Sequence, residues 1–112
     1  MGYGFGPGGG PIRTHSHRYS TRTSFDYGHT HELSGITSPT INPGPRHVHV
    51  MQGVTTYNDG HTHVYRVTTG PAIPTRPGYH VHNYYGVVSV AGRPPHTHRF
   101  NGVTSERQDD YR

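Results

Sequence analysis

The placement of histidine constrains this chain more than any other feature. The sequence has 12 histidines, and each of them belongs to a His-x-His pair. Successive pairs begin 14, 18, 14, 19 and 16 residues apart. Random placement would leave single histidines, so the pattern indicates a repeated unit. The pairs are His15/His17, His29/His31, His47/His49, His61/His63, His80/His82 and His96/His98.

Each unit continues beyond its histidines in a regular way. In an extended strand, positions one, three and five of a unit lie on one face. Residues two apart on a helix do not share a face, so we predict strands. Glycine stands at position seven of four units, which predicts a bulge or a close backbone approach. Position five is always large: Tyr19, Leu33, Met51, Tyr65, Tyr84 and Phe100.

The composition requires a source of stability other than an apolar core. Hydrophobic residues make up 28% of the chain and the mean hydropathy is -0.85, whereas soluble domains are roughly 45–50% apolar. The chain has no cysteine, which leaves metal binding and assembly as stabilising devices. We therefore predict an all-β fold. Its short antiparallel strands would form a repeat-like meander or a small β-sandwich, stapled by metal and completed by neighbouring subunits.

Segments rich in proline and glycine separate the units and suggest the domain organisation. Residues 1–12 are expected to be a Gly/aromatic N-terminal arm, 13–104 a six-unit His-x-His β-repeat domain, and 105–112 a polar C-terminal tail. Asn58-Asp59-Gly60 is the clearest hairpin turn. No apolar run approaches the roughly 18 residues of a membrane span, and the first residues do not have the pattern of a secretory signal.

Two imidazoles on one strand face can bind a single ion. Two pairs from adjacent strands would give a tetrahedral site, and three pairs around an axis would give an octahedral one. The ligand type favours a transition-metal ion, with zinc or copper preferred by affinity and iron or nickel possible. The low number of acidic residues argues against calcium or magnesium. All twelve histidines are candidate ligands, with a metal-free structural role or a pH switch as alternatives.

An enzymatic role is not expected. A catalytic metal needs an open coordination position, a general base and a pocket. No aspartate or glutamate follows the pairs at the spacing that known His-x-His metalloenzymes require. A repeated set of histidines without such partners is typical of a structural staple.

The segment from Gly28 to Ser105 resembles the YmaF family of Firmicutes. The resemblance rests on RHVHVMQGVTTYNDGHTHVYRV, TGPAIP and HTHRFNGVTS, which contain repeated H-x-H-x-φ-x-G-φ-T units. It implies shared paired histidines and a shared Asn-Asp-Gly turn. The first unit departs most, with Thr21 in place of glycine. The motif is also similar to that of phage tail fibres, in which pairs from three chains bind iron along an axis.

Three functions fit these features. The first is a structural protein that self-assembles into an extracellular filament or coat held by His-coordinated metal, at the cell or spore surface. The location expected for the protein is extracellular or at the cell or spore surface, and otherwise cytoplasmic. The second function is an Arg/Tyr-rich, sequence-independent nucleic-acid-coating protein that forms a nucleoprotein filament, because about three divalent ions would add about +6 to a basic chain. DNA or another polyanion would then contact Arg13, Arg18, Arg22 and Arg46. The third is a soluble metal buffer or metalloenzyme.

Overall fold

The computed structural model describes residues 14–110, and this part of the chain contains strands and no helix. The all-β prediction is therefore confirmed. The predicted N-terminal arm lies outside the described residues. The strands are β1 (Arg18–Arg22), β2 (Glu32–Ile36), β3 (Val50–Val54), β4 (Val64–Thr68), β5 (Ile73–Arg76), β6 (Tyr79–Val81), β7 (Asn83–Val87), β8 (Arg99–Val103) and β9 (Arg107–Gln108).

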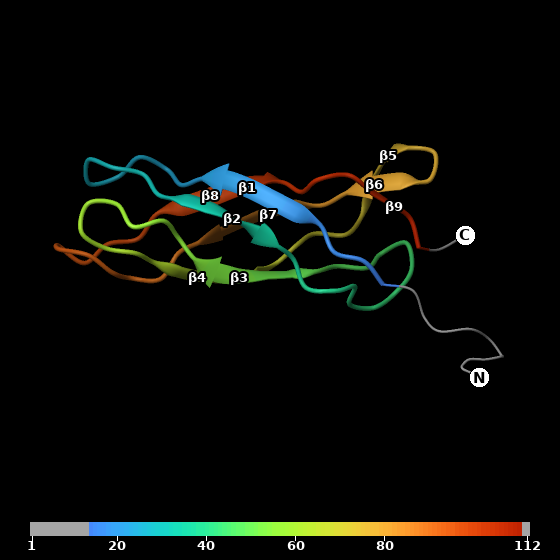
Figure 1. Cartoon of the computed structure of the whole chain (residues 1–112), viewed down its shortest axis with the longest axis horizontal. Coiled ribbons are helices and arrows are strands. Elements are labelled where there is room, and N and C mark those ends of the chain that lie inside the picture. Colours follow the sequence, from blue (N-terminus) through green and yellow to red (C-terminus); the bar gives the residue numbers. More distant parts are fainter. Residues whose placement is uncertain (1–13, 111–112) are drawn as a thin grey trace.

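Three antiparallel two-stranded ribbons form the body of the molecule: β1–β2, β3–β4 and β7–β8. Each of these six strands begins directly after a His-x-His pair. The ribbons lie side by side along the long direction of an elongated molecule (Figure 1). Because β2 contacts β3, β4 contacts β7 and β8 contacts β1, the ribbons close into a ring. The arrangement is a meander wrapped around an axis, and the ribbons do not stack as two facing sheets.

Backbone hydrogen bonds join the ribbons in a threefold pattern. At each end of the ring, every ribbon donates one bond from the second residue after one of its strands to a strand of a neighbouring ribbon. At one end Ser24, Thr56 and Ser89 donate to the carbonyl oxygens of Arg99, Glu32 and Val64. At the other end Ser38, Gly70 and Ser105 donate to those of Val50, Asn83 and Arg18. The three ribbons are therefore approximately equivalent around the long axis.

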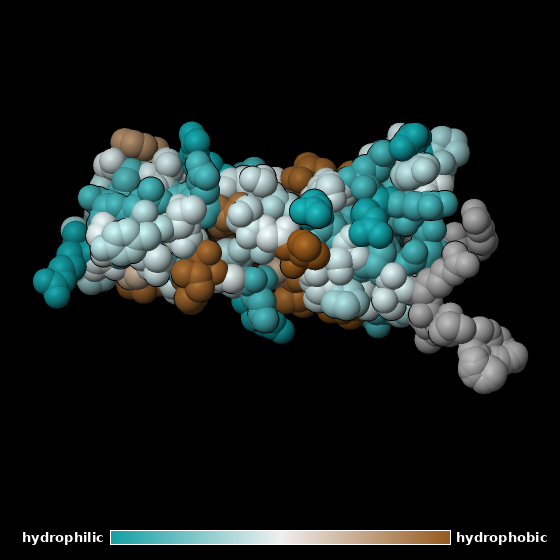
Figure 2. Space-filling model, viewed as in Figure 1, coloured by the Kyte–Doolittle hydropathy of each residue, from teal (hydrophilic) through white to brown (hydrophobic). Residues whose placement is uncertain are grey.

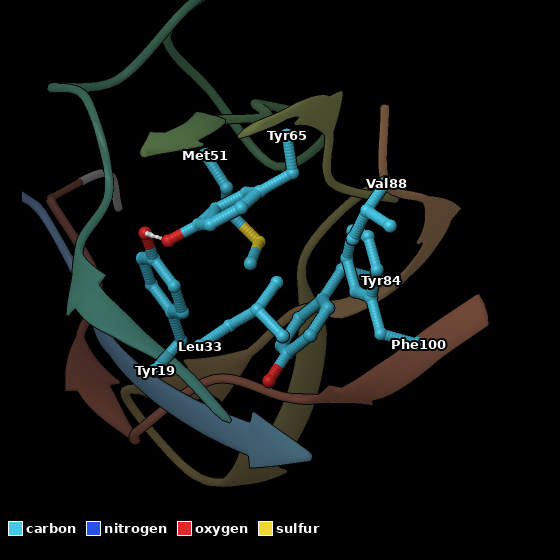
Figure 3. Packing of buried hydrophobic residues seen from close by; sticks show 7 residues of the cluster. All are labelled: Tyr19, Leu33, Met51, Tyr65, Tyr84, Val88 and Phe100. Atoms are coloured by element: carbon cyan, nitrogen blue, oxygen red, sulfur yellow. Dashed lines mark hydrogen bonds between the residues drawn. The ribbon is translucent and has the colours of Figure 1, made fainter. Parts of the chain in front are cut away.

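The side chains at position five fill the middle of the ring. All six are buried and pack together with Val88 (Figure 3). The hydroxyl groups of Tyr19 and Tyr65 share a hydrogen bond of 2.7 Å inside this core. The structure thus confirms that two histidines and one bulky residue of each unit face the same side.

Glycine at position seven makes room for an aromatic ring on the paired strand. Gly35 lies opposite Tyr19, and a Cβ added at Gly35 would stand 2.8 Å from the Tyr19 hydroxyl oxygen. The pairs Gly53–Tyr65, Gly102–Tyr84 and Gly86–Phe100 repeat this relation. Where position five is Leu33 or Met51, the opposite residue is Thr21 or Val67. The ladders are regular here, so the glycines mark close approach and not bulges.

Two of the ribbons turn through matching tight loops. Tyr27-Gly28 and Asp59-Gly60 have positive φ at both residues, as a two-residue type I′ hairpin turn requires. The predicted turn at Asp59-Gly60 is therefore present. The third ribbon turns through a longer loop between Ala91 and His96. All three turns lie at the end of the molecule opposite β5, β6 and β9 (Figure 1).

A fourth, three-stranded sheet lies at the other end, in the order β5-β6-β9. It brings β9, from the predicted polar tail, against a hairpin inserted between β4 and β7. In the described part of the chain, no helix is long and apolar enough to cross a membrane.

Candidate metal centre

The antiparallel ribbons sort the six His-x-His pairs into two clusters. In each ribbon the first strand and the second strand run in opposite directions, so their preceding pairs lie at opposite ends. The proximal cluster, at the β5-β6-β9 end, consists of His15, His17, His47, His49, His80 and His82. The distal cluster, near the hairpin turns, consists of His29, His31, His61, His63, His96 and His98.

The structure thus brings three pairs together in each cluster. Of the two predicted arrangements, this is the one that gives an octahedral site. The six pairs form two sites, and not the three sites assumed for the charge argument. Within each cluster, one ligand atom per histidine lies within 4.8 Å of the others. Two divalent ions would therefore add about +4 to the chain instead of about +6.

The spacing of the Nε2 atoms matches the edges of a coordination octahedron. His15, His47 and His80, the first members of the proximal pairs, form a triangle with Nε2–Nε2 distances of 2.9, 3.1 and 3.2 Å. In the distal cluster, His61 lies 3.2 Å from His31 and 3.0 Å from His63. Metal–nitrogen bonds of about 2.1 Å at right angles place neighbouring nitrogens about 3.0 Å apart. The measured distances agree with this value.

The second histidine of each pair is oriented by a backbone carbonyl. A carbonyl oxygen only accepts, so the ring nitrogen that contacts it, Nδ1, carries the proton. The lone pair on Nε2 then points into the cluster. The Nδ1-to-oxygen contacts are His17–Ser105 (2.7 Å), His31–Thr56 (2.9 Å), His49–Ser38 (3.0 Å), His63–Ser89 (2.7 Å), His82–Gly70 (2.8 Å) and His98–Ser24 (3.1 Å).

The first histidines are oriented through the same ring atom. Four donate from Nδ1 to carbonyl oxygens, namely His29–Tyr27 (3.1 Å), His47–Gly44 (2.7 Å), His61–Asp59 (3.0 Å) and His96–Pro94 (2.7 Å). The other two donate to carboxylates, His15 to Asp110 (2.5 Å) and His80 to Asp109 (2.6 Å). All twelve rings therefore turn Nε2 inward, and such a contact on the far nitrogen is the usual companion of a histidine that binds metal.

Six neutral imidazoles with inward lone pairs form an electrostatically costly arrangement. Lone pairs that face one another at 3 Å repel, and burial excludes the water that would separate them. Among the described residues, the buried Nε2 atoms of His29, His49, His96 and His98 have no hydrogen-bond partner. A cation at the centre of each cluster would satisfy all six atoms at once.

Burial also keeps many of these imidazoles neutral. Burial, with a smaller contribution from neighbouring histidines, lowers the pKa of His17 to about 3 and the pKa values of His49 and His82 to about 4. Burial lowers the pKa values of His31, His47, His63, His80 and His98 in the same direction. At neutral pH these eight histidines are therefore in the deprotonated form that metal binding requires.

All four aspartates of the chain lie at the clusters, and the sequence reasoning did not identify them as part of the site. Asp109 and Asp110 contact the proximal cluster. At the distal cluster, an Asp59 oxygen lies 3.1 Å from His29 Nδ1 and an Asp26 oxygen lies 3.5 Å from His98 Nδ1. Each cluster thus has two carboxylates, whose combined negative charge would balance the positive charge of one divalent ion. The sequence offered one signal for this role, namely that acidic residues are few. Both glutamates form ion pairs with arginine, so only the aspartates lie at the histidines.

Buried threonines hold the backbone of the histidines, and the sequence pattern did not predict this role either. In five units the residue at position nine is a threonine whose Oγ1 accepts a hydrogen bond from the N–H of a histidine on the paired strand. The pairs are Thr23–His31, Thr37–His17, Thr55–His63, Thr69–His49 and Thr104–His82. The sixth unit has Val88 at this position, and that side chain joins the apolar core instead.

Of the four arginines suggested as polyanion contacts, the three that the structure describes are not part of either cluster. Arg13 lies outside the described residues. Arg18 and Arg46 are exposed. Arg22 is also exposed and forms an ion pair with Glu32, with a nitrogen–oxygen distance of 3.3 Å.

Comparison with known proteins gives one similarity. The model of the YmaF family, described as "Spore germination protein GerY/YamF", matches residues 9–70, which is more than half of the chain. Curated proteins and solved structures gave no match. On the strength of the family match, this chain belongs to the YmaF family.

Proposed function

We propose that this protein is a structural metal-binding protein in which two metal ions fasten the ends of a rigid β rod. One observation carries the proposal. Twelve imidazoles in two sets of six have Nδ1 bound to oxygen and Nε2 directed inward. The apolar core between the clusters is small, consisting of seven buried side chains. Metal binding would therefore supply much of the free energy of folding, as in other small domains held by metal.

The preferred ion would be six-coordinate. Zinc favours four ligands in structural sites, and copper(II) favours tetragonal geometry. Neutral imidazole also suits iron and nickel, and both ions accept six nitrogen ligands in octahedral geometry. We propose iron(II) or nickel(II), which replaces the preference for zinc or copper that ligand type alone suggests.

A structural role agrees with the number of ligands. A catalytic metal keeps an open position for water or substrate. Six histidines fill an octahedron and leave no such position. We therefore propose that the protein is not an enzyme and that its ions are permanent parts of the fold.

Elemental analysis of the purified protein tests the proposal. We expect two transition-metal ions per chain, and a lower unfolding temperature after treatment with a chelator. His17→Ala removes one proximal ligand and should reduce the content to one ion, whereas Ser20→Ala, at an exposed position of β1, should keep two. A chain that stays free of metal when supplied with iron, nickel, zinc and copper would refute the proposal.

The family description suggests a role at the spore, and we propose that the rods assemble there into an extracellular filament or coat. The rod has exposed apolar side chains on its outer face, among them Ile36, Val54, Tyr85, Val87 and Val103. Figure 2 shows several such patches on one side of the molecule. Negative-stain microscopy and sedimentation of the metal-loaded protein test this step. A monodisperse monomer with two ions would end the assembly proposal and leave metal binding intact.

A further inference from the structure

The two clusters differ in the carboxylates that contact them. In the proximal cluster, Asp109 and Asp110 accept from His80 and His15 at 2.6 and 2.5 Å, and their side chains are only 19% and 23% exposed. In the distal cluster, Asp59 and Asp26 lie 3.1 and 3.5 Å from their histidines and are 63% and 42% exposed.

The distal carboxylates also share their histidines with other acceptors. His29 Nδ1 lies 3.1 Å from the Tyr27 carbonyl oxygen, and His98 Nδ1 lies 3.1 Å from that of Ser24. In contrast, His80 has Asp109 as its short Nδ1 contact, and His15 has Asp110. The carboxylate charge therefore acts more directly on the proximal ligands.

The chain holds Asp109 and Asp110 in place through contacts that do not involve histidine side chains. Strand β9 pairs with β6, and the Asp109 N–H donates to the Gly78 carbonyl oxygen at 2.7 Å. Glu106, just before β9, accepts from Arg76 at 3.0 Å and from Thr75 at 2.5 Å. The β5–β6 hairpin that receives this segment lies in the connection between β4 and β7. In the described residues, the connection between β2 and β3 has only an isolated bridge, Ile41–Val48.

We propose that residues 106–110 form a carboxylate clamp that makes the proximal site the tighter of the two metal sites. This inference rests on the proposed metal-binding function. A carboxylate that accepts the Nδ1 proton of a metal ligand raises the basicity of that ligand, and such partners change metal affinity by about 10–100-fold. Partial burial reduces screening by water and salt, which strengthens the effect. Asp109 and Asp110 are thus positioning residues that decide which of the two sites binds metal more tightly. Their negative charge also makes the proximal site favour the more highly charged oxidation state of a bound ion.

Chelator competition on the metal-loaded full-length protein tests the clamp. We expect two release phases of one ion each, with the distal ion released first. His31→Ala should abolish the fast phase and His17→Ala the slow phase, which assigns the phases to the clusters. Release of both ions in a single phase, or a slow phase assigned to the distal cluster, would overturn the inference. A wild-type chain without metal would instead refute the proposed function.

The double variant Asp109→Asn/Asp110→Asn separates charge from geometry, because the asparagine oxygen still accepts a hydrogen bond. We expect proximal release to become about 10-fold faster or more, with distal release unchanged. Asp26→Asn/Asp59→Asn is the matched control and should have a smaller effect. In iron-loaded protein, the proximal midpoint potential should rise in the double variant, which a merely structural role would not produce. Loss of the distal ion in that variant would assign the segment to the fold and overturn the clamp.

If the double variant does not fold, Glu106→Gln provides a second test. This change weakens the contacts with Arg76 and Thr75 and leaves both aspartates in place. We expect faster proximal release at unchanged distal release, with a smaller change than in the double variant. An unchanged proximal rate would show that the anchoring of the segment does not set the affinity.

Discussion

At the scale of single residues, each histidine ring is fixed by an oxygen that accepts from Nδ1. Because these acceptors are mostly backbone carbonyls, the orientation of the rings depends on the path of neighbouring loops. The carbonyl of Ser105, for example, orients His17, 88 residues earlier in the chain. The repeat pattern identified the ligands, but it contained no information about these partners.

The glycine at position seven gives the first prediction. Gly102→Ala places a Cβ 2.4 Å from the Tyr84 hydroxyl oxygen, so the aromatic side chain must shift. We expect a loss of about 1–3 kcal/mol in the free energy of unfolding, as for other overpacked cores. Urea denaturation measures the change.

The chain itself supplies the rescue for this variant. The double change Gly102→Val/Tyr84→Met copies the natural pair Val67–Met51 and should recover part of the lost stability. Thr21, the polar side chain beside the Tyr84 hydroxyl, donates its own proton to the Asn101 carbonyl oxygen at 2.7 Å, so removal of the Tyr84 hydroxyl should leave no donor unpaired. A double variant less stable than Gly102→Ala would argue against size matching across the strands.

The threonine at position nine gives a second prediction. Thr37→Val removes the Oγ1 that accepts from the His17 N–H at 3.0 Å, leaving a buried donor unpaired. We expect a cost of about 1–3 kcal/mol in thermal or urea unfolding. Val88→Thr is the matched change in the unit that naturally has valine. If Thr37→Val were neutral, water would have to reach the His17 amide.

At the scale of secondary structure, the ribbons depend on tight turns that few residues can adopt. Gly60 has a φ of +83°, and nothing lies within 4 Å of a Cβ added there. Gly60→Ala should therefore destabilise the protein by about 1–2 kcal/mol through backbone strain alone. Gly70→Ala is the control, because its Cβ would make an ordinary contact of 3.6 Å with the Asn83 carbonyl oxygen. Equal stability of the two variants in urea denaturation would contradict this interpretation.

The sequence predicted these elements well because their causes are local. The alternation of buried and exposed positions in β3 and β4 follows directly from His-x-His-x-large residue. The turn at Asp59-Gly60 is encoded by residues that tolerate positive φ. The role of position seven remained open between a bulge and a close approach, because the facing residue lies on another strand.

At the scale of the whole molecule, the histidine clusters should make stability fall steeply in acid. His17, His49 and His82 have pKa values near 3 to 4 when folded, against about 6.5 when unfolded. Below pH 6.5 the unfolded chain therefore binds protons that the folded chain does not. Each such group lowers the free energy of unfolding by about 1.4 kcal/mol per pH unit until its folded pKa is reached.

Thermal unfolding between pH 7.5 and pH 4 measures this effect. The unfolding temperature should be highest above pH 6.5 and should decrease progressively toward pH 4. Metal-loaded protein should show the same direction, because protons compete with the ion for the imidazole nitrogens. Stability that is constant or increases toward pH 4 would contradict the neutral state of the clusters.

The sequence by itself determined the repeated unit, the six strands that follow the histidine pairs, and the twelve inward-facing histidines. These properties follow from alternation along an extended chain, which depends only on residues close in sequence. The tertiary structure decided how the pairs combine. Antiparallel pairing sends alternate pairs to opposite ends, and closure of three ribbons around an axis brings three pairs together at each end. It also brought Asp109 and Asp110 to the proximal cluster, through pairing of β9 with β6, whose partner residues lie 27 and 29 positions earlier. Such contacts depend on long-range packing, which no local pattern contains.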